Sequence, residues 1–79
     1  MVNVKLYAGL RQFAPEDNEL GDFFQIEMQG NTVNDLIKKL GIREVHVQIV
    51  MINGERAIDF DETLAEDDLV VIFPPIGGG

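Results

Sequence analysis

The sequence has no cysteine, no serine and no tryptophan, and its only histidine is His46. Without cysteine, no disulfide or thiolate metal site can stabilise the fold, so an apolar core must do this alone, which is compatible with an intracellular protein. Without serine or cysteine, and with a single histidine, the chain has almost nothing from which to build a nucleophilic dyad. These absences argue against a self-contained enzyme.

Positive charge is also scarce, with 6 Lys and Arg against 14 Asp and Glu and a net charge of −8. Such a chain repels phosphate backbones, so we expect no nucleic-acid partner and favour partners with basic surfaces. No apolar run approaches membrane-spanning length, and residues 1–7 alternate apolar with polar instead of forming the apolar segment of a signal peptide. We expect a soluble, cytoplasmic protein that has no membrane partner.

Two strands are predicted in the first third of the chain. Apolar and polar residues alternate over residues 2–8 and again over 24–28, which is the pattern of strands with one buried face. We expect these strands to pair as an N-terminal hairpin. Between them, residues 10–14 are expected to form a helical turn that breaks at Pro15.

One main helix is predicted after the second strand. Thr32 is a suitable N-cap, apolar residues recur at helical spacing over residues 33–40, and Asp35 lies in the first turn, where negative charge is favoured. Gly41 follows as the stop signal.

The second half of the chain predicts the remaining strands. Residues 45–52 are largely apolar and β-branched, and Asn53-Gly54 then signals a tight hairpin with a short return strand over 55–58. Residues 69–73 are too apolar for an edge strand and should lie centrally. The 79 residues therefore predict one α+β domain over 1–79, a mixed sheet with one main helix on one face, for which the ubiquitin-like β-grasp is the familiar topology.

The C-terminal segment 74–79 predicts a flexible tail. Pro74 and Pro75 lack amide donors and should end the sheet. The glycines over 77–79 then reach at most about 10 Å and have no Cβ to obstruct a narrow channel. Such a tail can enter the active site of another protein.

Several motifs together resemble a known family, the small sulfur-carrier subunit of molybdopterin synthase and the related MoaD/ThiS-like, ubiquitin-related proteins. The resemblance spans nearly the whole chain, and Pro74-Pro75-x-x-Gly78-Gly79 is its most specific part. The other matching segments are Val4-Lys5-Leu6-Tyr7-Ala8 with Leu10-Arg11, Thr32-Val33-Asn34-Asp35-Leu36, Asn53-Gly54-Glu55 and the turn from Leu64 to Leu69.

The resemblance implies a sulfur-carrying substrate that is not an enzyme on its own. A ubiquitin-activating-type, MoeB-like enzyme would use ATP and magnesium to adenylate Gly79, and a sulfur donor would convert the adenylate to a thiocarboxylate. The large, MoaE-like subunit of molybdopterin synthase, in a heterotetramer, would then pass the sulfur to a pterin precursor of the molybdenum or tungsten cofactor. The chain itself is expected to bind no cofactor.

The resemblance also implies roles for particular residues. Gly79 would carry the reactive carboxylate, and Gly77 and Gly78 would be threaded with it into the partner. The partner-binding surface around the start of the tail would comprise Arg11, Phe73, Pro74, Pro75 and Ile76.

Other readings stay open at this point. The tail also fits a carrier for thiamin thiazole synthesis or tRNA thiolation, and a protein modifier that ends in an isopeptide bond; a binding module without tail chemistry is a further alternative. The acidic residues over 59–68 lack the spacing of a calcium loop, and a lone His46 on a strand is assigned no chemistry, so no metal site is predicted.

Overall fold

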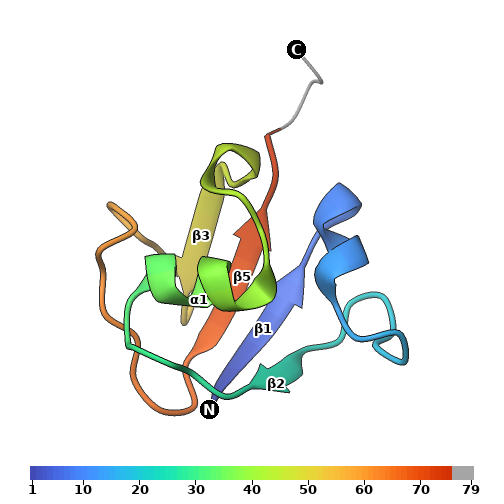
Figure 1. Ribbon diagram of the computed structural model, residues 1–79, viewed down its shortest axis with the longest axis horizontal. Coiled ribbons are helices and arrows are strands. Elements are labelled where there is room, and N and C mark those ends of the chain that lie inside the picture. The colour runs from blue at the N-terminus through green and yellow to red at the C-terminus, as the bar shows by residue number, and fades with distance from the viewer. Residues whose placement is uncertain (76–79) are drawn as a thin grey trace.

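A five-stranded mixed sheet carries the fold in this computed structural model, which describes residues 1–75. The strand order is β2-β1-β5-β3-β4, and only β1 and β5 pair in parallel (Figure 1). The strands are β1 (Val2–Leu6), β2 (Phe24–Ile26), β3 (Ile49–Ile52), β4 (Glu55–Arg56) and β5 (Leu69–Phe73), and the helices are η1 (Ala8–Phe13), α1 (Val33–Leu40) and η2 (Glu44–His46), of which η1 and η2 are 3₁₀ helices.

The principal sequence predictions about the sheet are confirmed. β1 and β2 form an antiparallel hairpin, and β5 lies in the middle of the sheet between β1 and β3. Val70 and Ile72 of β5 are fully buried, as expected for a central strand. The chain is thus α+β, with a mixed sheet and one main helix.

Helix α1 begins and ends where the sequence predicts. The Thr32 side chain accepts a hydrogen bond from the Asp35 N–H, and the Asp35 carboxylate accepts one from the Thr32 N–H, which completes a capping box. At the other end Gly41 has φ +82°, and its N–H donates to the carbonyls of Ile37 and Lys38.

The core lies between α1 and one face of the sheet, and Figure 1 shows the helix crossing that face. Alternate residues of β1 and β5 are buried toward the helix, so the other set of each strand is left on the opposite face. The core side chains are Val2, Val4, Leu6, Leu10, Val33, Leu36, Ile37, Ile42, Val47, Val50, Leu64, Val70 and Ile72.

The predicted strand over 45–52 is wrong at its start, because β3 begins only at Ile49. Residues 44–46 form η2 instead, closed by hydrogen bonds from the His46 N–H to the Arg43 carbonyl and from the Val47 N–H to the Glu44 carbonyl. Val45 and His46 are consequently exposed, although their apolar and β-branched neighbourhood resembles a strand.

Other predicted elements differ in length. The return strand expected over 55–58 is only β4, because the Ile58 N–H donates to the Glu62 carboxylate, 3.1 Å away, instead of continuing the ladder. The strands expected over 2–8 and 24–28 are β1 and β2, each two residues shorter at its end. The turn expected over 10–14 is η1, which starts two residues earlier and ends one residue earlier.

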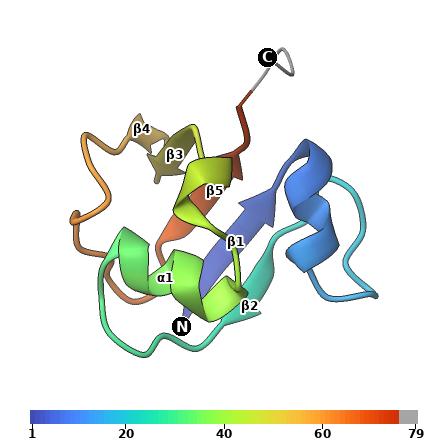
Figure 2. The same cartoon turned by 45° about the horizontal axis from the view of Figure 1, so that its top comes forward.

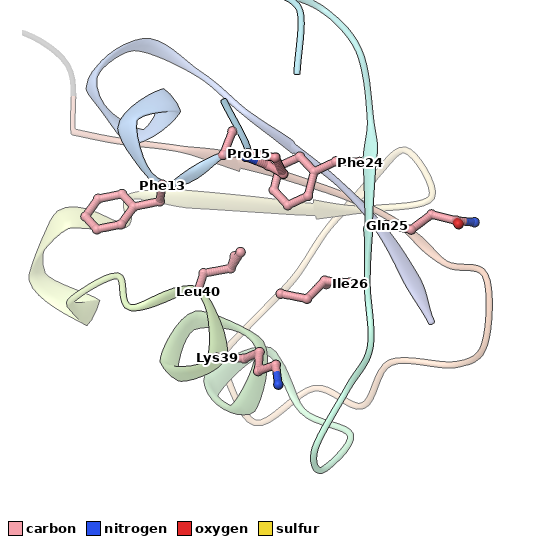
Figure 3. A pocket seen from close by; sticks show the side chains of 8 residues that line it. Phe13, Pro15, Phe24, Gln25, Ile26, Lys39 and Leu40 are labelled. Carbon is pink, nitrogen blue, oxygen red and sulfur yellow. The ribbon is translucent and has the colours of Figure 1, made fainter. Parts of the chain in front are cut away.

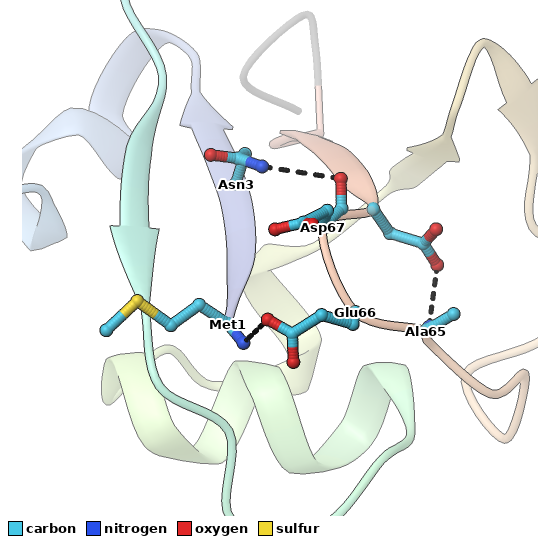
Figure 4. Close-up of polar contacts among 6 residues, drawn as sticks. Met1, Asn3, Ala65, Glu66 and Asp67 are labelled. Carbon is cyan, nitrogen blue, oxygen red and sulfur yellow. Dashed lines mark hydrogen bonds and ion pairs between the residues drawn. The ribbon is translucent and has the colours of Figure 1, made fainter.

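The loop before β5 is attached to the N-terminus (Figure 4). The Met1 amine pairs with the Glu66 carboxylate, the Asp67 N–H donates to the Met1 carbonyl, and the Asn3 side-chain amide donates to the Asp67 carbonyl. These contacts hold the start of β5 beside β1, where the parallel pairing begins.

No helix within residues 1–75 is long and apolar enough to cross a membrane. The same described residues hold no group of three or more His, Cys, Asp or Glu side chains that could bind a metal ion.

Candidate functional site

The face of the sheet opposite α1 carries apolar side chains that no helix within residues 1–75 covers. On β5 these are Leu69, Val71 and Phe73, which alternate with the buried Val70 and Ile72. Leu69 is 44% exposed. We call this surface the open face.

Strand register arranges the open face in rows. Ile49 of β3 lies opposite Phe73, and Tyr7 stacks on the other side of Phe73 with ring centroids 4.7 Å apart and planes 14° from parallel. The next row joins Lys5, Val71 and Met51. The first row is entirely apolar or aromatic and stands at the end of the sheet where the tail begins.

The open face continues onto the N-terminal hairpin. The Lys5 amine lies 4.5 Å from the centre of the Phe23 ring, in the geometry of a cation–π contact. Arg56 of β4 lies opposite Met51, so the face has positive charges beside its apolar rows at Lys5 and at Arg56.

The start of the tail borders a hollow of about 240 Å³. Pro74 is half-buried and Pro75 is exposed. They line the hollow together with Gly9, Leu10, Gln12, Phe13 and His46. His46 was assigned no role from its sequence pattern, but η2 places it beside Pro74 and Pro75.

Three of the predicted partner-binding residues lie together at the end of β5, whereas a fourth, Arg11, contacts the loop before β2. Phe73, Pro74 and Pro75 are consecutive at the end of β5. Arg11 lies on η1, but its guanidinium donates to the carbonyl of Asn18 at 2.9 Å and to the Asn18 side-chain oxygen at 3.4 Å. Arg11 thus holds the loop between η1 and β2, and its predicted partner contact stays a prediction.

The remaining predicted residues, Ile76, Gly77, Gly78 and Gly79, lie outside the described residues. Sequence reasoning also passed over Tyr7 as a site residue, even though the alternation over residues 2–8 puts it on the same face as Lys5. What it could not provide was the neighbour of Tyr7, because Phe73 reaches it only through the parallel pairing of β1 and β5.

An apolar surface that is left uncovered on a folded domain is suited to docking another protein. The sequence profile of the ThiS family matches residues 4–79. The chain belongs to the ThiS family. No curated protein matches the chain.

Solved structures similar to this ThiS-family chain include two archaeal proteins. A putative molybdopterin converting factor subunit 1 from Pyrococcus furiosus is 28% identical, with a TM-score of 0.61 over 95% of this chain and 97% of that chain. The small archaeal modifier protein 1 of Haloferax volcanii is 25% identical, with a TM-score of 0.66 over the same shares of the two chains.

A third similar structure is the complex of subunits 1 and 2 of the molybdopterin-converting factor from Helicobacter pylori. The matching chain is 19% identical, with a TM-score of 0.57 over 99% of this chain and 97% of that chain, which shows likeness of fold. Together these structures confirm the predicted ubiquitin-like β-grasp fold and the predicted resemblance to the sulfur-carrier family.

Proposed function

We propose that this chain is a sulfur carrier in molybdopterin biosynthesis, with the carboxylate of Gly79 as its working group. The observation that carries the proposal is the row of Tyr7, Phe73 and Ile49, an apolar surface directly before Pro74-Pro75 and the glycines. Membership of the ThiS family and the likeness to the Pyrococcus furiosus subunit support it.

The chemistry requires an activating enzyme, because a free carboxylate is a poor electrophile. An oxygen of the Gly79 carboxylate attacks the α-phosphorus of ATP, pyrophosphate leaves and an acyl-adenylate forms. A persulfide then attacks the carbonyl carbon and AMP leaves. A thiol cleaves the resulting acyl disulfide, which leaves the thiocarboxylate on Gly79. ATP and magnesium belong to the activating enzyme.

The carrier then acts as the small subunit of a molybdopterin synthase. The open face docks first on the adenylating enzyme and later on the large synthase subunit, because both must receive the same tail. The four residues from Ile76 to Gly79 reach at most about 14 Å beyond Pro75, so the partner must bind close to the end of β5 for its active site to receive Gly79.

A second candidate function is protein modification, in which Gly79 forms an isopeptide bond with a lysine. The likeness to the small archaeal modifier protein 1 favours it. Carriers for thiamin thiazole synthesis or tRNA thiolation use the same activated tail and differ only in the acceptor.

Intact mass measured after incubation with a cognate activating enzyme, ATP, magnesium, a persulfide donor and a thiol tests the proposal. We expect a gain of ~16 Da, one sulfur for one oxygen, on the full chain and none on a chain lacking Gly79. Transfer of that sulfur to a pterin precursor by the large subunit supports the synthase role, whereas lysine-linked adducts in cells favour the modifier. No adenylate and no mass gain with a competent activator would overturn carrier chemistry.

A further inference from the structure

The two edges of the sheet differ in how they are protected. At one edge β4 is two residues long and both residues, Glu55 and Arg56, are charged and exposed, which is how proteins commonly blunt an edge. At the other edge β2 consists of Phe24, Gln25 and Ile26, with no charge and no proline. Within residues 1–75 no strand pairs with the outer side of β2.

The register of β1 shows which backbone groups of β2 point outward. The Asn3 N–H donates to the Asp68 carbonyl, on the side of β5. Backbone groups alternate in direction along a strand, so those of Val2 and Val4 point to β2. Gln25 lies opposite Asn3, between the pairs that bond across the ladder, and therefore directs its N–H and C=O to the free edge.

A groove of about 310 Å³, lined by both apolar and polar side chains, lies beside this edge (Figure 3). Phe24 and Ile26 point into it from β2, and Leu40 points into it from the end of α1, while the Gln25 side chain points away. Phe13 and Pro15 complete the apolar lining. An added strand could thus bond to Gln25 and place alternate side chains in the groove.

The charges around the groove are uneven. Lys39 lines it at the α1 side and Lys38 precedes it in the same helical turn, although the whole chain has a net charge of −8. The ion pair found within residues 1–75 joins Met1 to Glu66, so Lys39 is not neutralised there. At the Phe24 end the neighbouring hollow is lined by Asp17, Glu19 and Asp22. Carboxylates are therefore favoured only at the α1 end.

We propose that the groove between β2 and α1 is a second docking site, which binds an extended peptide segment of a partner protein as an added strand on β2. The segment has apolar residues at alternate positions and carboxylates at one flank, which lie beside Lys39. The groove lies on the side of the sheet that α1 covers, whereas the open face is the opposite side. Both sites can therefore be occupied at once. The proposal does not depend on tail chemistry.

The test uses the full chain and the synthetic peptide Ile-Thr-Val-Thr-Ile-Asp-Glu-Asp, blocked at both ends. On titration we expect the largest amide shifts at Gln25 and its strand, and slower hydrogen exchange of the Gln25 N–H. The peptide with Lys-Arg-Lys in place of the acidic flank should bind more weakly, even though the overall charge of the chain favours it.

Two substitutions with the same change of charge isolate the local contact. Lys39→Glu should weaken binding of the acidic peptide about fivefold or more, whereas Lys38→Glu, one residue away and outside the lining, should change it by less than about twofold. Gln25→Pro should weaken binding about tenfold, because it removes the outward donor that the ladder does not use.

Three outcomes would overturn the proposal: shifts confined to the open face, equal or tighter binding of the basic peptide, or a chain that dimerises through β2 in the absence of peptide. If Gln25→Pro fails to fold, hydrogen exchange in the unmodified chain still tests the proposal. Slower exchange of the Gln25 N–H with peptide supports strand addition, and unchanged exchange contradicts it.

Discussion

Tyr7 and Phe73 stack with ring centroids 4.7 Å apart, although they lie near opposite ends of the chain. The parallel pairing of β1 with β5 brings them together, and Ile49 lies on the other side of Phe73. This aromatic pair is the part of the open face nearest to Pro74 and Pro75, so under the proposed function it is where we expect a partner to contact the domain first.

Phe73→Asp should slow thiocarboxylate formation about tenfold or more, because a charge in the apolar row opposes docking of the activating enzyme. The rate of the mass gain measures the effect. Ile58→Asp is the matched control, since Ile58 is 92% exposed and lies in the loop after β4, away from the row of Tyr7, Phe73 and Ile49. Equal rates for the two variants would contradict docking through the open face.

Gly30→Ala should lower the free energy of unfolding by about 2–3 kcal/mol, measured by urea titration. Gly30 has φ +99°, and a Cβ there would lie 2.3 Å from the Asp35 carboxylate oxygen, which disrupts the capping box as well as straining the backbone. Gly21→Ala is the control, because Gly21 has φ +88° but no atom within 4 Å of the added Cβ. It should cost about 1 kcal/mol; similar costs at both sites would show that the Asp35 contact is unimportant.

Asp35 should make stability depend on acid pH. Hydrogen bonds from the Thr32 backbone and side chain, and then from the Asn31 N–H, lower the pKa of the Asp35 carboxyl below its ordinary value of 3.8. Because the folded pKa is the lower one, the stabilisation is complete well above 3.8 and is lost as pH falls through the folded pKa.

Urea unfolding of the chain and of Asp35→Asn, compared at pH 6 and below 3.8, measures this effect. The stability difference between them should shrink as the pH falls. A difference that stays constant across the range would contradict the assignment to Asp35.

Asn53 should stabilise the fold through both its backbone and its side chain. It has φ +52° in the turn between β3 and β4, its side-chain oxygen accepts from the Leu69 N–H and its amide donates to the Asp68 carboxylate, both at 2.9 Å. Asn53→Gly keeps the turn and should cost about 1–2 kcal/mol in thermal or urea unfolding for the two lost bonds.

Asn53→Ala loses the same bonds and also strains the turn, so it should cost about 1 kcal/mol more than Asn53→Gly. If the alanine and glycine variants are equally stable, the positive φ contributes nothing. If the glycine variant matches the unmodified chain, the side-chain contacts with β5 contribute nothing.

Short-range interactions explain which elements could be predicted. The bounds of α1 follow from Thr32, Asp35 and Gly41, because each cap bonds to a group within a few residues of itself. The Asn53-Gly54 hairpin was predicted for the same reason. By contrast, the start of β3 could not be predicted, since residues 44–46 satisfy both the strand pattern and the 3₁₀ turn.

The sequence by itself determined the run of glycines after Pro74-Pro75, the capped helix, the hairpin turn and the alternation of apolar and polar residues in the first strands. Only the tertiary structure decided which distant residues come together: Phe73 stacks with Tyr7, Arg11 bonds to Asn18, and Lys39 lines the same groove as Phe24 and Ile26 of β2. The physical reason is that alternation and caps depend on neighbours along the chain. These contacts depend instead on the strand order, which pairs β1 with β5 from the two ends of the chain, and on the packing of α1 against the sheet.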